Sequence, residues 1–143
     1  MEQIHLDIVH PLAVEENWTI VAPYILQAVG EEVDKTDVEY IKAAAQRGVA
    51  QIWVIHRAKH IEAVLVTETA FYGGRRTLVL RWLAGVEVEE WLDLLSYVED
   101  WAYANQYERI EVWGRKGWEK VLRTQQYLHQ FTVLGKPLAR RLQ

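Results

Sequence analysis

The sequence contains no cysteine, a single methionine and no long apolar run. Without cysteine, the chain has no disulfide, no thiolate nucleophile and no zinc site of the cysteine type. No segment approaches the ~20 apolar residues that cross a bilayer, and residues 1–9 lack the basic start and apolar block of a signal peptide. We therefore expect a soluble protein that is not exported.

Basic residues are also missing from a long stretch, because none occurs between Trp82 and Glu108. Residues 1–108 hold 8 Lys and Arg against 18 Asp and Glu, whereas residues 109–143 hold 8 against 2. Opposite charge at the two ends favours oriented docking, either between copies of the chain or onto a charged partner. The alternative is that the two charged regions are solvated and neutralise one another within the fold.

Several catalytic patterns are absent as well. The sequence has no Ser-His-Asp order, no P-loop glycine pattern and no Rossmann fingerprint. What it does have is 143 residues, half of them hydrophobic, with seven Trp and seven Tyr. This composition predicts a single domain over residues 1–143 with large rings in its core and at an interface.

The N-terminal part predicts one strand and two helices. Alternation over residues 4–8 ends at Pro11, and this pattern indicates a strand followed by a turn. A helical period over residues 18–29 stops at Gly30, and Pro23 within it predicts a kink or an early break. Thr36 or Asp37 is placed to cap a second helix that Gly48 closes.

The next segment changes to the period of strands. We expect an antiparallel meander over residues 50–83, with turns at Ala58-Lys59 and Gly73-Gly74. A helical period returns over residues 88–102, with Glu89, Glu90 and Asp93 near its N-terminus. A short strand at 109–113, a short helix at 118–125 and a final strand at 127–134 complete the prediction.

This order is strand, two helices, three antiparallel strands, helix, strand, helix and strand. It resembles the GNAT N-acetyltransferase superfamily, an α+β fold with a mixed, mostly antiparallel central sheet flanked by helices. The resemblance is strongest where residues 107–112 (Tyr-Glu-Arg-Ile-Glu-Val) lead to residues 117–122 (Gly-Trp-Glu-Lys-Val-Leu) and then Gln126-Tyr127. Gln126 stands where the family usually has glycine.

The same C-terminal stretch, continued through residues 129–138, is also similar to that of small GNAT-like proteins of tailed bacteriophages, some of them virion components. In family enzymes, the loop after the fourth strand holds the pyrophosphate of acetyl-CoA with backbone amides and a helix dipole. That loop here is degenerate, since it reads Ala84, Gly85, Val86, Glu87 and Val88 and continues into two more glutamates. Like charges disfavour phosphate there, so we expect no cofactor.

Two further positions bear on catalysis. The resemblance places the family's general-acid tyrosine near Leu122, which has no hydroxyl. Glu68, on the second meander strand, is a weak candidate for the base that accepts a proton from an amine, because a half-buried carboxylate can have its pKa raised. The alternative is that Glu68 is a solvent-facing strand residue.

Other ligand classes have weaker support. His56 and His60 flank the first hairpin turn, but only Glu62 is near them as a carboxylate, so we expect no metal site. Rings and cations interleave near the C-terminus, which is a composition that can bind nucleic acid, although a core-facing Trp pair beside a solvated loop explains it better. These residues and the basic tail are instead candidates for binding a protein partner: Trp113, Arg115, Lys116, Trp118, Arg140 and Arg141.

The sequence thus favours a GNAT-fold protein that has lost acetyl transfer and acts as a binding or structural component. The resemblance implies a role in a phage particle or in phage-host interaction, and the charge distribution predicts a head-to-tail ring or array of copies. A small regulator that binds a host protein is a third reading. The rival hypothesis is an acyltransferase that uses acetyl-CoA with an altered donor loop and Glu68 as its base. Membrane binding is not expected.

Overall fold

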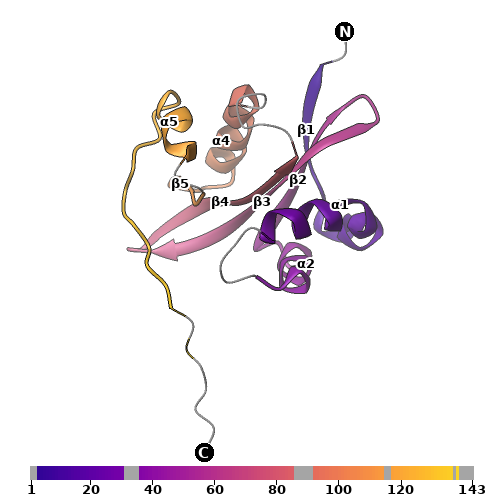
Figure 1. The fold of residues 1–143 in the computed structure, drawn as a ribbon, viewed down its shortest axis with the longest axis horizontal. Helices are drawn as coiled ribbons and strands as arrows, with labels where there is room; N and C mark the ends of the chain where they lie inside the picture. Colours follow the sequence, from indigo (N-terminus) through magenta and orange to yellow (C-terminus); the bar gives the residue numbers. More distant parts are fainter. Residues whose placement is uncertain (1–2, 31–35, 86–91, 115–116, 137, 139–143) are drawn as a thin grey trace, which may run out of the picture.

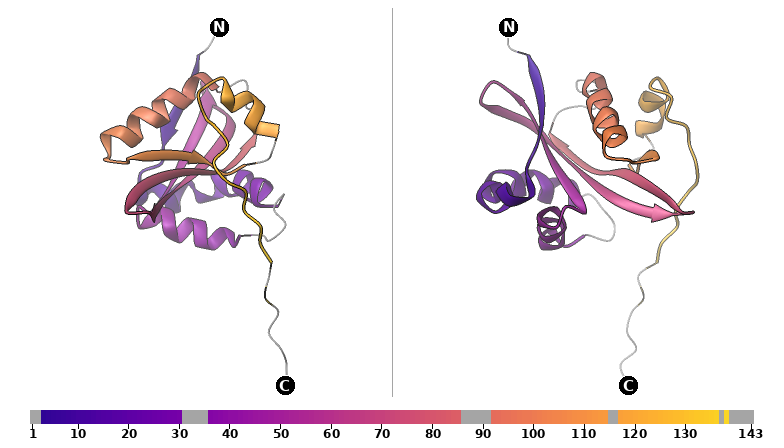
Figure 2. Two further views of the ribbon diagram at one scale, coloured as in Figure 1. Left: turned by 90° about the vertical axis from the view of Figure 1, so that its left-hand side faces the viewer. Right: turned by 180° about the vertical axis from the view of Figure 1, so that it is seen from behind.

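The computed structural model describes residues 3–30, 36–85, 92–114, 117–136 and 138. One mixed sheet lies between two helical layers, with α1 and α2 on one face and α4 and α5 on the other (Figures 1 and 2). The elements are β1 (Ile4–Ile8), η1 (Pro11–Ala13), α1 (Val14–Val29), α2 (Val38–Gln46), β2 (Ala50–Arg57), β3 (His60–Tyr72), β4 (Arg75–Gly85), η2 (Leu92–Leu94), α4 (Leu95–Ala104), β5 (Arg109–Val112) and α5 (Gly117–Arg123).

The two N-terminal helices follow local signals in the sequence, with one exception. α2 begins after Asp37, whose carboxylate accepts a hydrogen bond from the Glu39 amide at 3.0 Å and so caps the helix. α1 runs through Pro23 to Val29, so the expected break at this proline is wrong. Packing of the apolar face against the sheet outweighs the lost backbone hydrogen bond, because Val21, Ile25 and Val29 are all buried.

The sheet has the strand order β1-β2-β3-β4-β5. The first four strands pair antiparallel, and β5 pairs parallel to β4. The expected meander is therefore confirmed, and the hairpin turns fall at Ala58 and at Gly73-Gly74. β5 is short, and its pairing with β4 covers only Thr77–Leu80 of the longer strand.

A β-bulge in β4 changes which face its side chains reach. Val66 pairs with Trp82 and Thr67 pairs with Leu80, so Arg81 is an extra residue inserted into the register of β4 against β3. Residues two apart in a regular strand share a face. Leu80 nevertheless packs with the α4 and α5 layer, whereas Trp82 packs with the α1 and α2 layer.

The core is accordingly divided between the two faces of the sheet. On one face, Leu65 and Leu78 pack against Leu95 and Val98 of α4 and Leu122 of α5. On the other face, Val66 and Trp82 belong to a cluster with Ile25 of α1 and Ile41 of α2. Buried rings contribute to both clusters, since Trp53 and Trp82 are each 4% exposed. Each helical layer therefore fixes one face of the sheet.

The C-terminal part departs from the sequence prediction. Residues 127–136 form neither helix nor strand, so the predicted strand at 127–134 is wrong. The segment crosses β5 at a steep angle instead of running beside it (Figure 2). Contacts to distant residues hold this course, because the Tyr127 hydroxyl donates to Glu99 on α4 at 2.6 Å and Gln130 accepts from Arg109 at 2.7 Å. Gln126, just before it, has a φ of 69°, the region that favours the glycine usual in GNAT proteins.

The helix expected over residues 88–102 is described only from residue 92, and there it starts later than expected. Residues 92–94 form a 3-10 turn and α4 begins at Leu95.

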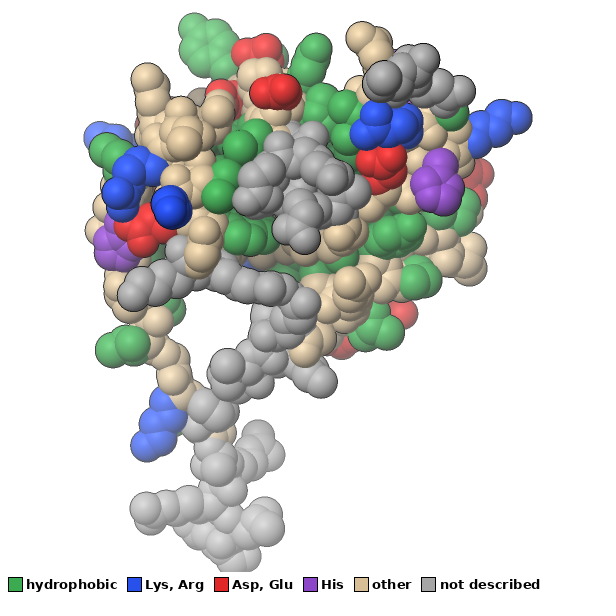
Figure 3. All heavy atoms as spheres, turned by 45° about the horizontal axis from the view of Figure 1, so that its top comes forward, with side chains coloured by type: hydrophobic (Ala, Val, Ile, Leu, Met, Phe, Trp, Pro, Cys, Tyr) green, Lys and Arg blue, Asp and Glu red, His purple; other side chains and the backbone are tan. Residues whose placement is uncertain are grey.

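Among the described residues, no helix is long and apolar enough to span a bilayer. On the face that Figure 3 shows, Lys and Arg side chains lie next to Asp and Glu side chains, so the two signs are mixed there.

Gly85, at the end of β4, is required by close packing against β3. A Cβ at this position would lie 2.2 Å from the Glu62 carbonyl oxygen, and the φ of Gly85 is 123°. We expect Gly85→Ala to lower the free energy of unfolding by roughly 2–4 kcal/mol through steric overlap and backbone strain. Urea unfolding measures the loss.

Gly73 is the matched control for this prediction. It also has a positive φ, of 61°, but a Cβ there would meet nothing within 4 Å. We expect Gly73→Ala to cost only about 1 kcal/mol, the penalty of the backbone conformation alone. Equal losses in the two variants would show that the contact with β3 does not matter.

Candidate functional site

A groove opens where β4 and β5 separate. The Trp113 amide donates to the Leu80 carbonyl at 3.0 Å, and the register between the two strands ends at Leu80 and Val112. β4 continues to Gly85, so residues 81–85 have no strand partner on the β5 side among the described residues. The groove there has a volume of about 1390 Å³. Its open strand edge offers backbone hydrogen-bonding groups to a ligand.

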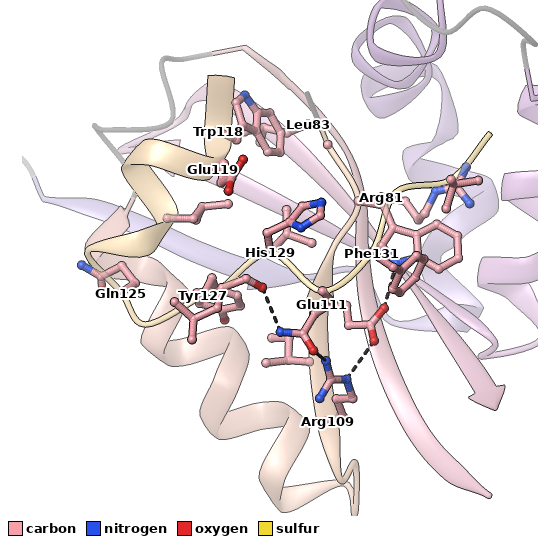
Figure 4. Close-up of a pocket in the computed structure, with 18 of the residues that line it drawn as sticks. Arg81, Leu83, Arg109, Glu111, Trp118, Glu119, Gln125, Tyr127, His129 and Phe131 are labelled. Carbon is pink, nitrogen blue, oxygen red and sulfur yellow. Dashed lines mark hydrogen bonds and ion pairs between the residues drawn. The ribbon is translucent and has the colours of Figure 1, made fainter. Parts of the chain in front are cut away.

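One wall of the groove is apolar. Leu83, Val112, Trp118 and Leu122 line it, and they pack with the core cluster under α4 and α5. Figure 4 shows Trp118 and Glu119 entering from α5 and the chain of residues 125–131 closing the side. An apolar slot beside an unpaired strand edge suits a narrow ligand that carries amide groups.

The opposite wall is polar and is built around Glu111, whose side chain is 6% exposed. Glu111 accepts hydrogen bonds from Trp113 Nε1 at 2.9 Å and from Arg109 Nε at 2.8 Å (Figure 4). Burial opposes ionisation of this carboxyl, but hydrogen bonds from Trp113, Tyr72 and Arg109 outweigh it and hold the pKa of Glu111 below its usual value. Glu111 is therefore charged at neutral pH.

A second carboxylate lies on the same face of the sheet, two strands away. Glu68 on β3 and Glu111 on β5 both pair with Val79 of β4. Glu68 Oε1 is 3.4 Å from Arg81 Nη1, and Glu68 Oε2 accepts a hydrogen bond from the Tyr40 hydroxyl at 3.1 Å. The charge of Glu68 raises the pKa of Tyr40, with burial adding to the effect. Glu68 is thus half-buried and engaged on both oxygens, not a freely solvated strand residue.

Arg81 contacts Glu68 directly, and its contact with Trp113 leads to Glu111. Its guanidinium carbon lies 4.3 Å from the centre of the Trp82 ring and 5.0 Å from that of Trp113. Trp113 in turn is oriented by its hydrogen bond to Glu111. The bulge contributes to this placement, because it inserts Arg81 as an extra residue of β4 in the lining of the groove.

The position that the resemblance assigns to a general acid is Leu122, which has no hydroxyl to donate a proton. Leu122 is 5% exposed and lies in the groove wall. Tyr127 also lines the groove, but its hydroxyl donates to Glu99. Burial, together with the Glu99 carboxylate, raises the pKa of Tyr127 above its usual value. Tyr127 is therefore a poor proton donor to a leaving group.

The proposed donor loop is described only in part. Ala84 is buried and Gly85 ends β4, and the close approach that Gly85 allows is to the backbone of β3. Val86, Glu87 and Val88 lie outside the described residues, as do four of the partner-binding candidates: Arg115, Lys116, Arg140 and Arg141. The repulsion of phosphate by this loop stays a prediction.

The remaining two candidates, Trp113 and Trp118, do not form one surface. Trp118 packs with the core cluster under α4 and α5, and Gly114 makes room for its ring, since a Cβ there would lie 2.6 Å from it. Trp113 is 39% exposed and contacts Glu111 and Arg81. The two rings therefore lie on different walls of the groove.

The histidines of the first hairpin are not brought together with a set of metal ligands. His56 bonds Asp7 of β1 through Nε2 at 2.5 Å, a carboxylate that lies 49 residues away in the sequence. This bond, with one to the Ala58 carbonyl, raises the pKa of His56. Within the described ranges, no group of three or more metal-binding side chains is present.

Sequence reasoning missed three residues of this site: Tyr40, Arg81 and Glu111. An Arg inside an apolar strand and a Glu inside a short one are weak signals that mark positions needing a polar partner. The pairing of Tyr40 with Glu68 joins positions 28 residues apart and has no local signal.

The comparisons with known proteins bear on the fold alone. No family model and no curated protein matches the chain. Among solved structures, an aminoglycoside N-acetyltransferase in complex with CoA matches with a TM-score of 0.70 and 8% identity, over 96% of each chain. An aminoglycoside acetyltransferase from an uncultured soil metagenomic sample, in complex with sisomicin, matches with a TM-score of 0.67 and 11% identity, over 95% of this chain and 97% of that one. The chain has the GNAT fold.

A further neighbour is a ribosomal-protein-alanine N-acetyltransferase from Brucella melitensis, with a TM-score of 0.61, 12% identity and coverage of 97% of this chain and 100% of that one. At such low identity the likeness establishes the fold alone. The mixed, mostly antiparallel sheet expected from the sequence is thereby confirmed, while the activity has to be argued from the site.

The low pKa of Glu111 predicts a pH-dependent contribution to stability. A carboxyl whose pKa is depressed on folding stabilises the protein above its unfolded pKa, and this stabilisation is lost as the pH falls through its folded pKa. We therefore expect Glu111→Gln to lower the free energy of unfolding most at pH 7 and progressively less as the solution is acidified below the usual pKa of glutamate. Urea unfolding across pH measures the difference.

Glu108, exposed just before the same strand, provides the control. We expect Glu108→Gln to change the free energy of unfolding by less than about 0.5 kcal/mol at every pH, as for most exposed positions. A penalty for Glu111→Gln that does not depend on pH would contradict the assignment.

Proposed function

We propose that the protein is an N-acyltransferase that uses an acyl-CoA thioester as donor, bound in the groove between β4 and β5. The observation that carries this proposal is the separation of the two strands after Leu80 and Val112, which leaves the edge of residues 81–85 open beside an apolar wall. The pantetheine arm of CoA carries amide groups that can pair with such an edge as a strand does. Acetyltransferases with this fold, one of them in complex with CoA, support the same reading.

In this proposal, Glu68 is the residue that accepts the proton of the incoming ammonium. The neutral amine then attacks the thioester carbonyl, so that a nitrogen–carbon bond forms and the carbon–sulfur bond breaks. The second nitrogen proton passes to the departing thiolate. Neither Leu122 nor Tyr127 provides an acid for that last step, because the first lacks a hydroxyl and the pKa of the second is raised. Because a thiolate is a stable leaving group, it can depart without an acid and then take the second nitrogen proton itself.

The second candidate is the binding or structural component favoured by the sequence, including its phage role. The C-terminal segment supports it, because Leu128, Val133 and Leu134 are 64%, 72% and 92% exposed. Exposed apolar side chains on an extended segment are typical of protein-binding surfaces. Self-association and a protein partner remain predictions under this reading.

Donor binding tests the first proposal directly. We expect acetyl-CoA and CoA to bind with a Kd of roughly 1 µM, which corresponds to about -8 kcal/mol. Isothermal titration at low salt measures it. Leu83→Trp fills the groove and is expected to abolish the heat, whereas Leu12→Trp, at a site that is 87% exposed, leaves it unchanged. Absence of heat with the unaltered protein would contradict donor binding and leave the role as a binding or structural component.

The role of Glu68 gives a separate prediction. Loss of a general base typically slows a reaction by ~10²–10⁴-fold. We expect Glu68→Gln to lower the rate of CoA release by this factor and to retain acetyl-CoA binding. A thiol reagent measures the release with a panel of amines. Glu39→Gln, on the exposed side of α2, is the control. Donor binding together with unchanged turnover in Glu68→Gln would remove this residue from the mechanism.

A further inference from the structure

Arg81 stands between the groove and Glu68. The arginine lines the groove, and its Nη1 lies 3.4 Å from Glu68 Oε1. The other oxygen of Glu68 accepts the hydrogen bond of Tyr40 at 3.1 Å. Both oxygens of the carboxylate are thus in use, and a ligand that enters from the groove meets Arg81 first.

The guanidinium of Arg81 lies within cation–π distance of two tryptophan rings. It lies 4.3 Å from the ring centre of buried Trp82 and 5.0 Å from that of Trp113. Trp113 is fixed by the hydrogen bond that it donates to Glu111 at 2.9 Å. The donors on the edge of a guanidinium match a carboxylate, which they can bind with two parallel hydrogen bonds.

This arrangement discriminates between acceptor amines. A purely cationic amine that reaches Glu68 has to separate the ion pair with Arg81 and then remains beside a second positive charge. An acceptor with a carboxylate next to its amine avoids both costs, because its carboxylate takes over Arg81 while its ammonium takes over Glu68. Each charge of the ligand then meets an opposite charge.

We propose that the acceptor is an amino acid with a free carboxylate, bound through its carboxylate by Arg81 and through its ammonium by Glu68. This inference rests on the proposed function, because only an acyltransferase has an acceptor. The binding that it describes requires neither donor nor turnover. The neighbouring rings of Trp113 and Phe131, which also line the groove, favour an apolar side chain on that amino acid.

The test compares amino acids with the amines that lack only the carboxylate: L-phenylalanine with phenethylamine, and L-leucine with isopentylamine. Each is titrated into the full chain without acetyl-CoA, and the indole N–H resonance of Trp113 is followed by NMR. Trp113→Phe identifies that resonance among the seven tryptophans. We expect each amino acid to bind at least about tenfold more tightly than its matched amine, since hydrogen bonds between charged groups are strong.

Arg81→Gln removes the carboxylate-binding group and is expected to abolish the preference, whereas Arg75→Gln, at the exposed start of β4, keeps it. Equal binding within a pair, tighter binding of the amine, binding of neither, or a preference that survives Arg81→Gln would each overturn the inference. Titration with acetyl-CoA separates this result from the proposed function. Amino-acid binding without acetyl-CoA binding would remove acyl transfer and leave the amino-acid site standing.

Discussion

The separation of β4 from β5 is the constraint on which the candidate site depends. A parallel strand pair that stayed in register to Gly85 would close the sheet and bury every edge group of β4. Instead, the pairing ends at Leu80 and Val112, and the chain turns away through Trp113 and Gly114 toward α5. The open edge, the apolar wall and the entrance at Arg81 all follow from that departure.

The bulge at Arg81 works together with this separation. It sends Leu80 and Trp82 to opposite faces of the sheet, so each helical layer receives one large side chain from the same short stretch. The extra residue is left at the mouth of the groove. A bulge next to an open strand edge is a recurrent way to aim a side chain into a site, and here the side chain so aimed is a cation placed against Glu68.

Charges of both signs lie at the groove. Glu111 pairs with Arg109, and Glu68 pairs with Arg81. A groove of this kind attracts neither polycations nor polyanions by charge alone, and it favours ligands that carry both signs at matching distances. Because Glu87, Glu89 and Glu90 follow Gly85 in the sequence, we expect donor binding to depend more on the open strand edge than on phosphate contacts.

The order of the elements as far as α5 could be read from the sequence, because strand and helix periods, the cap at Asp37 and the glycine turns are local signals. The sequence could not give the course of α1 through Pro23 or the unpaired segment at 127–136, since distant packing and single contacts to Glu99 and Arg109 decided them. Among the residues of the site, Glu68 could be identified from the sequence as a carboxylate on a strand. Its partners could not, because Tyr40 and Arg81 reach it from another helix and from a bulge that shifts the register of β4. A one-residue change of register reverses the face of every following side chain, and only the tertiary structure fixes where that change occurs.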